Sequence, residues 1–146
     1  MTINLPDSLR VEPDDYENKQ EPGPVMAKKG KRIFIVEDES TIRDLYKDML
    51  GMEGYVVFAV ESGEEGLQYW DNDSFDLIIC DLGLPGMNGW EFIARIRENN
   101  SGVPIIALTG WGDMISTQEA SDHKVQQVIS KPVQLNQLMQ IIYNLL

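Results

Sequence analysis

The sequence predicts an α/β fold, a doubly wound parallel sheet of five strands with five helices. Two observations lead to this prediction. From residue 31 onward, short apolar runs alternate with stretches of helical periodicity, the pattern of βα units. Several of the apolar runs also end in a polar residue, and the strand ends of an open parallel sheet meet at one edge, where such sheets bind ligands. We therefore expect one folded domain over residues 31–146.

Each expected strand is a short apolar run bounded by turn-forming or polar residues. Gly54 precedes the second run, and Asp81 ends the third. In chain order, the strands are expected at about 32–37, 55–60, 75–80, 103–108 and 125–130.

Apolar residues at helical spacing mark the helices between and after these strands. Ser62 can cap the second helix, and residues 85–89 form a turn before the third. The fourth helix, at roughly 112–122, has few apolar residues, so two interpretations stay open: a weakly anchored helix that moves beside the site, or an ordinary surface helix. The apolar stripes are Ile42, Leu45, Met49 and Leu50; Leu67 and Trp70; Trp90, Ile93, Ala94 and Ile96; Met114, Ile115 and Ala120; and Leu135, Leu138, Ile142 and Leu145.

Residues 1–30 precede the domain, and we expect a disordered, acidic, proline-containing tail there. Residues 1–27 hold four of the seven prolines and six acidic residues against two basic ones, with no sustained apolar period. A segment that orders on contact with a partner is the functional alternative. A solvated extension is the simpler interpretation, because the composition shows no anchor pattern.

The composition excludes several classes of function. The 146 residues suit one domain, and the net charge of -12 disfavours binding to nucleic acid or to an anionic membrane surface. The single cysteine cannot form a disulfide within the chain, and no apolar stretch resembles a signal segment or a membrane span. We therefore expect a cytoplasmic protein.

Groups suited to phosphoryl chemistry stand where the strands end. Glu37 and Asp38 follow the first apolar run, Asp81 the third, Thr109 the fourth and Lys131 the fifth. Taken singly, each has an ordinary explanation: the acidic pair as an exposed helix start, the threonine as a helix cap, the lysine as a loop residue. Because parallel strands end at one edge, the five side chains are expected to converge, and their conjunction indicates a site.

The chemistry of these five residues fits transfer of a phosphoryl group. Adjacent carboxylates repel each other unless a cation joins them, and Mg²⁺ prefers the oxygen ligands that Glu37, Asp38 and Asp81 would supply. An aspartate such as Asp81 can act as a nucleophile and form an acyl phosphate. The transition state needs positive charge around its oxygens, which Mg²⁺ and Lys131 would supply, while Thr109 donates its hydroxyl. Since a proline follows Lys131, that peptide bond can be cis and aim the lysine toward the crevice.

Five stretches together carry a specific family resemblance: Glu37-Asp38, 75–82, 84–89, 104–110 and Lys131-Pro132. Residues 31–146 resemble a response-regulator receiver domain of two-component signalling. The resemblance implies a flavodoxin-like strand order, 2-1-3-4-5.

The resemblance also implies roles for the five residues. Asp81 would be the phosphoacceptor, Glu37, Asp38 and Asp81 would bind Mg²⁺, and Thr109 and Lys131 would read the phosphoryl group. The donor would be a phosphohistidine on a sensor histidine kinase or a histidine phosphotransfer protein.

Other functions remain open. A phosphohydrolase of the haloacid-dehalogenase type needs a second aspartate two residues after its nucleophile, where this chain has Gly83. A flavodoxin-like cofactor carrier conflicts with the acidic residues 37–39, which would repel a flavin phosphate. A receiver-like binding module that acts without phosphorylation is favoured by Val128, because receiver domains usually carry Tyr or Phe there.

The chain ends with the helix after Lys131, so we expect a stand-alone receiver. It would be a phosphoacceptor signalling protein rather than an enzyme, acting by docking or by passing its phosphoryl group onward. Its downstream target would bind the surface formed by residues 111–146. A homodimer that forms on phosphorylation stays open.

Overall fold

The computed structural model describes residues 28–110 and 117–146. Residues 1–27 of the tail expected over residues 1–30, and residues 112–116 of the fourth helix expected at 112–122, lie outside these ranges. In chain order, the elements are β1 (Arg32–Val36), α2 (Ser40–Met52), β2 (Val56–Val60), α3 (Gly63–Tyr69), β3 (Leu77–Asp81), α4 (Gly89–Asn99), β4 (Ile105–Thr109), α5 (Thr117–Asp122), β5 (Gln127–Ser130) and α6 (Leu135–Leu145).

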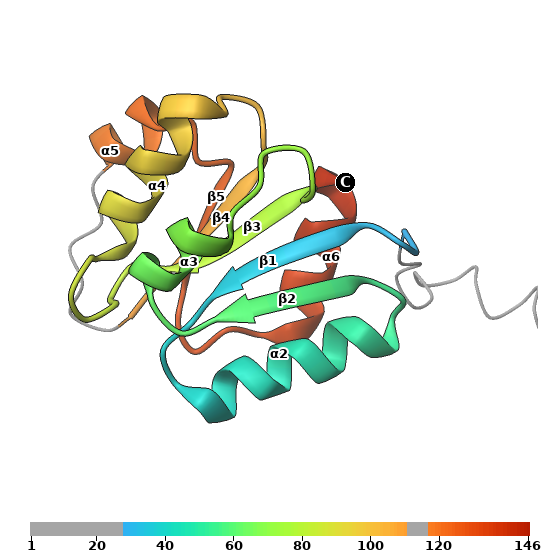
Figure 1. Ribbon diagram of the computed structural model, residues 1–146. Helices are drawn as coiled ribbons and strands as arrows, with labels where there is room; N and C mark the ends of the chain where they lie inside the picture. The colour runs from blue at the N-terminus through green and yellow to red at the C-terminus, as the bar shows by residue number, and fades with distance from the viewer. Residues whose placement is uncertain (1–27, 111–116) are drawn as a thin grey trace, which may run out of the picture.

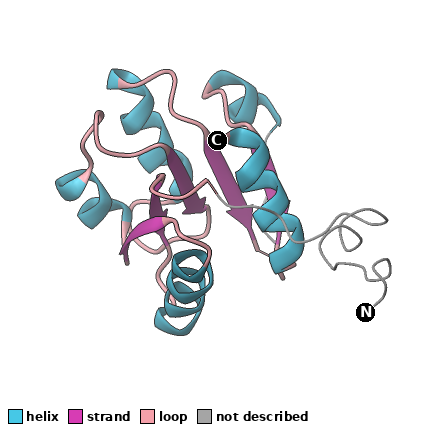
Figure 2. Ribbon diagram, turned by 90° about the vertical axis from the view of Figure 1, so that its right-hand side faces the viewer, coloured by secondary structure: helices cyan, strands magenta, loops and turns pink. Residues whose placement is uncertain are grey.

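All five strands form one parallel sheet in the order β2-β1-β3-β4-β5 (Figure 1), as expected for a receiver-like chain. Helices lie on both sides of the sheet (Figure 2). Buried side chains of α4 and partly buried ones of α3 pack on one face, and those of α2 and α6 pack on the other. The three central strands β1, β3 and β4 are therefore buried on both faces, which is why they consist of apolar runs without alternation.

Three strands, β3, β4 and β5, begin two residues later than the apolar runs suggested. Before β3, the Asp76 carboxylate accepts a hydrogen bond from the Arg32 backbone N–H at 2.8 Å. Before β4, Pro104 has no backbone N–H that could donate a hydrogen bond to a neighbouring strand. The ends of β3 and β4 reach one residue further than expected, so Asp81 and Thr109 are the last residues of their strands.

The apolar stripe predicted for α2 is partly wrong. Leu45 is 42% exposed, whereas Tyr46 and Leu50 are the buried residues of this helix. A helix turns by about 100° per residue, so positions 46 and 50 share one face and position 45 lies at its margin.

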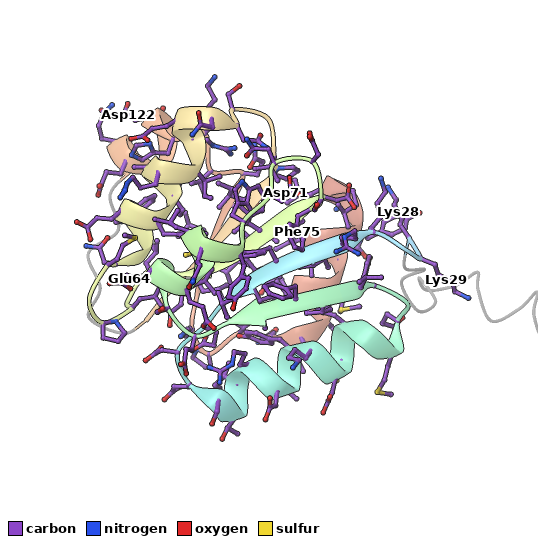
Figure 3. All side chains as sticks on the ribbon, in the orientation of Figure 1. Lys28, Lys29, Glu64, Asp71, Phe75 and Asp122 are labelled. Carbon is purple, nitrogen blue, oxygen red and sulfur yellow. The ribbon has the colours of Figure 1, made fainter. Side chains whose placement is uncertain are left out.

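Aromatic rings fill the side of the sheet under α3 and α4. Phe34 of β1 lies 4.8 Å from Phe75 and 5.3 Å from Trp70 between ring centroids, both edge-on. Phe75, labelled in Figure 3, stands just before β3. Phe92 of α4 lies so close to α3 that a Cβ on Gly66 would be 2.7 Å from its ring. The absence of a side chain at Gly66 therefore allows α3 to pack closely against α4.

Among the residues that the structure describes, no helix is long and apolar enough to cross a membrane.

Candidate functional site

Asp81, Lys131 and Glu37 are joined directly at the edge where the strands end. The Lys131 Nζ donates a hydrogen bond to Asp81 Oδ2 at 2.9 Å and to Glu37 Oε1 at 3.5 Å. Asp81 is the last residue of β3, Glu37 follows β1, and Lys131 follows β5. Both carboxylates are buried, and the Lys131-Pro132 peptide bond is cis.

Three carboxylates converge there. One ligand oxygen each from Glu37, Asp38 and Asp81 lies within 4.8 Å of the others, an arrangement that could hold a metal ion. Glu37 and Asp81 are buried and Asp38 is exposed, so an ion bound between them would face solvent on the Asp38 side. An all-oxygen donor set open to water is the kind that Mg²⁺ takes, because this ion keeps several of its waters.

Thr109 ends the strand beside Asp81. In the β3–β4 register Asp81 pairs with Leu108, so Thr109 lies one position further toward the site. Thr109 is buried, and its carbonyl accepts a hydrogen bond from the Lys131 backbone N–H at 2.8 Å. The structure thus brings all five side chains predicted from the sequence to the same edge of the sheet.

The loop from β3 to α4 is shaped around Asp81. The Gly83 N–H donates to Asp81 Oδ1 at 2.9 Å. Gly89, the first residue of α4, lies against the backbone of Asp81, so closely that a Cβ would be 2.4 Å from the Asp81 carbonyl oxygen. From α3, Glu64 (labelled in Figure 3) accepts a hydrogen bond from the Met87 N–H at 3.1 Å.

Burial and ion pairing shift the ionisation of this cluster. Burial raises the pKa of the Glu37 carboxyl, although the Glu39 N–H and the Lys131 ammonium lower it. Burial lowers the pKa of the Lys131 ammonium, but the hydrogen bond and charge of Asp81, together with Glu37, outweigh it and leave the pKa raised. Lys131 therefore stays a cation among the carboxylates. Cys80, next to Asp81, is buried, and burial raises the pKa of its thiol.

Sequence reasoning missed two residues of α2 that border the site. The Arg43 guanidinium donates to the Glu37 carbonyl at 2.8 Å and to the Asp38 carbonyl at 3.3 Å. Tyr46 lines a cavity of about 460 Å³ beside Lys131. A basic residue in the second turn after an acidic pair was the available signal for Arg43, and it is weak because exposed helix arginines are common. The apolar walls of the cavity are Ile42, Leu45, Pro132, Val133 and Leu135.

Comparison with known families agrees with this geometry. A model of the response regulator receiver domain matches residues 33–143, most of the chain. The chain therefore belongs to the family of response regulator receiver domains, which are signalling phosphoacceptors of two-component systems.

Individual relatives are similar over most of the chain. The two-component response regulator PhoP of Pseudomonas aeruginosa is 35% identical over 107 residues, 73% of this chain and 48% of that protein. The transcriptional regulatory protein GlrR of Escherichia coli is 33% identical over 117 residues, 80% of this chain and 26% of that protein. The chain thus spans half or less of the length of these two relatives.

A solved structure also shares the fold. The response regulator protein TrrA of Thermotoga maritima, in complex with Mg²⁺-BeF, is 33% identical with a TM-score of 0.72; the match covers 80% of this chain and 99% of that one. TrrA has also been solved in complex with the histidine kinase ThkA.

Proposed function

We propose that residues 31–146 act as a phosphoacceptor receiver domain, phosphorylated on Asp81 by a phosphohistidine of a sensor histidine kinase or a histidine phosphotransfer protein. The observation behind this proposal is the joining of Asp81 to Lys131 at 2.9 Å within the three-carboxylate cluster. The kinase complex of the relative TrrA supports the class of partner.

Each residue has a chemical role in the proposed transfer. A carboxylate oxygen of Asp81 attacks phosphorus, and the bond from phosphorus to the donor imidazole nitrogen breaks. The imidazole keeps the electron pair and takes a proton from water. Lys131 and the Thr109 hydroxyl hold phosphoryl oxygens, which stabilises their developing charge.

A magnesium ion fits the donor set of Glu37, Asp38 and Asp81. When bound, it would supply further positive charge to the phosphoryl oxygens. The complex of TrrA with Mg²⁺-BeF supports this choice of metal. Glu37 and Asp38 would hold the ion from the β1–α2 turn, and Asp81 would both hold it and accept the phosphoryl group.

The output surface is proposed to be α5, β5 and α6, within residues 111–146. Phosphorylation would replace the Asp81 carboxylate with a bulkier dianion. Thr109, at the end of the neighbouring strand β4, would then move toward the phosphoryl group. Substitutions on this surface should abolish phosphorylation-dependent binding of a target or of a second copy of the chain. Equal loss from substitutions on other surfaces would contradict the assignment.

The proposal is tested by the intact mass of the protein after incubation with acetyl phosphate, with and without Mg²⁺, beside an Asp81→Asn variant. We expect a magnesium-dependent gain of one phosphoryl group that the variant lacks. A second receiver domain that accepts a phosphoryl group from acetyl phosphate, incubated in parallel, shows that the incubation time and the protein concentration suffice. No gain under those conditions would contradict the proposal and favour the binding module that acts without phosphorylation, for which Val128 in place of the usual aromatic residue is the supporting observation.

A further inference from the structure

We propose that Arg43 is a positioning residue for the metal site: its guanidinium holds the β1–α2 turn in the conformation that presents Glu37 and Asp38 to Mg²⁺. This inference rests on the proposed magnesium site. Arg43 itself cannot be a ligand of a cation, because a guanidinium has donors only. Its effect on the site would therefore run through the turn.

The contacts of Arg43 all point to the turn rather than to solvent. The side chain is half-buried, and the same nitrogen, Nη1, donates to the Glu37 carbonyl at 2.8 Å and to the Asp38 carbonyl at 3.3 Å. These are consecutive carbonyls of the segment that carries two of the three carboxylates. A hydrogen bond from a charged donor to a partly buried carbonyl is among the stronger ones in proteins.

Without Arg43, few bonds would fix this turn. Its start is held by the Glu37 N–H, which donates to the Val60 carbonyl at 3.1 Å. The Glu37 carboxylate accepts from the Glu39 N–H at 3.1 Å, so one of its oxygens is used locally. The cap residue of α2, Glu39, forms no side-chain capping bond. The Asp38 carbonyl would then lose the guanidinium bond at the exposed end of the cluster, where the carboxylate is freest to move.

The sign of the effect separates positioning from plain electrostatics. Arg43 puts a positive charge on the turn that binds a cation. If its charge alone mattered, replacing it by a neutral residue would strengthen binding of Mg²⁺. If it positions the carboxylates, the replacement weakens binding in spite of the more negative site. The two explanations thus predict opposite changes in affinity.

The test is calorimetric titration of the full chain with Mg²⁺ alone, comparing wild type, Arg43→Gln and Arg43→Lys. We expect Arg43→Gln to bind about 10-fold more weakly, in the range seen when groups behind metal ligands are removed. Arg43→Lys keeps the charge and should fall between the two. The matched control is Lys47→Gln: Lys47 lies one turn further along α2 and is exposed, and its side chain forms no hydrogen bond or ion pair with the described residues. This control should bind as tightly as wild type or slightly more tightly.

Thermal melts of the metal-free proteins show whether the loss reflects unfolding: a positioning role predicts that Arg43→Gln stays folded at the titration temperature, although the loss of its two hydrogen bonds lowers the melting temperature by a few degrees. Equal or tighter binding by Arg43→Gln would overturn the inference. Should Arg43→Gln not fold, Arg43→Lys decides, and wild-type affinity in that variant would overturn the inference equally. Failure of wild type itself to bind Mg²⁺ would instead contradict the proposed function.

Discussion

The domain has two functional halves that are held in different ways. The phosphoacceptor half is the crevice around Asp81, and the output half is the proposed surface of α5, β5 and α6. On the phosphoacceptor side, Asp81 and Glu37 share Lys131, and Arg43 bonds the turn that carries Glu37, so the cross-links lie at the crevice itself. On the output side, bonds from α4 and β4 hold the chain just beyond α5. There Arg97 donates to the carbonyls of residues 123 and 124 at 2.6 and 2.9 Å, and Gln126, just beyond, bonds to the start of β4 at the opposite edge of the sheet.

This difference indicates separate roles for the two halves: one positions charged groups, and the other responds by a change in conformation. Bonds at the crevice would keep its charged groups in position for the proposed phosphoryl transfer, the step for which misplacement would cost most. If phosphorylation of Asp81 displaces Thr109, α5 would shift relative to the anchored residues 123–126. Arg97 would then act as the fixed point about which α5 responds.

The largest expected effect comes from breaking the phosphoacceptor half through Gly89→Ala. The new Cβ would lie 2.4 Å from the Asp81 carbonyl oxygen and 2.6 Å from the Leu82 Cα, and backbone atoms cannot rotate away. We expect a loss of about 3 kcal/mol in the free energy of unfolding, measured by urea titration, together with slower phosphorylation of Asp81.

Gly51→Ala is the matched control for Gly89→Ala. A Cβ on Gly51, in the last turn of α2, would meet nothing within 4 Å. This substitution should stabilise the protein by roughly 0.5–1 kcal/mol, since alanine is the better helix former. If Gly89→Ala proved as well tolerated as Gly51→Ala, the close approach of α4 to Asp81 would make no contribution to the free energy of unfolding.

Arg97→Gln should break the output half alone. It removes three hydrogen bonds from one half-buried guanidinium, two to residues 123 and 124 and one to the Asn100 carbonyl at 3.1 Å. We expect about 2 kcal/mol lower stability and faster amide hydrogen exchange in residues 117–125, measured by mass spectrometry, with the affinity for Mg²⁺ unchanged.

Arg95→Gln controls for the charge change, because Arg95 is exposed and its side chain forms no hydrogen bond or ion pair with the described residues. Weaker Mg²⁺ binding in Arg97→Gln would show that the two halves are not independent, and the comparison would have to be given up.

Much of the fold could be predicted from the sequence because the central strands are buried on both faces and so appear as continuous apolar runs. The convergence of Glu37, Asp38, Asp81, Thr109 and Lys131 followed from one topological rule, that parallel strands end at the same edge. Packing between distant segments escaped prediction. Nothing local in the sequence says that Phe92 will press on Gly66, since this contact depends on how closely α3 approaches α4.

The smallest expected effect concerns pH and Glu37. Burial raises the pKa of this carboxyl in the folded protein, so its favourable contribution to stability is complete at low pH and is lost as pH rises through the folded pKa. At neutral pH the ionised Glu37 therefore destabilises the metal-free fold. Glu37→Gln should raise the metal-free melting temperature at pH 7 by a few degrees, an advantage that shrinks toward pH 4.

Added Mg²⁺ should reverse the order of the two proteins, because the ion binds the carboxylate and stabilises wild type but gains less from the amide. Glu98→Gln is the control, since Glu98 is exposed on α4 and its side chain has no hydrogen bond or ion pair among the described residues. A metal-free Glu37→Gln protein less stable than wild type at pH 7 would mean that the bonds from Lys131 and the Glu39 N–H outweigh the burial of the charge. The phosphoacceptor half would then be held together by its own charges, and Mg²⁺ would add to an arrangement that is already stable without it.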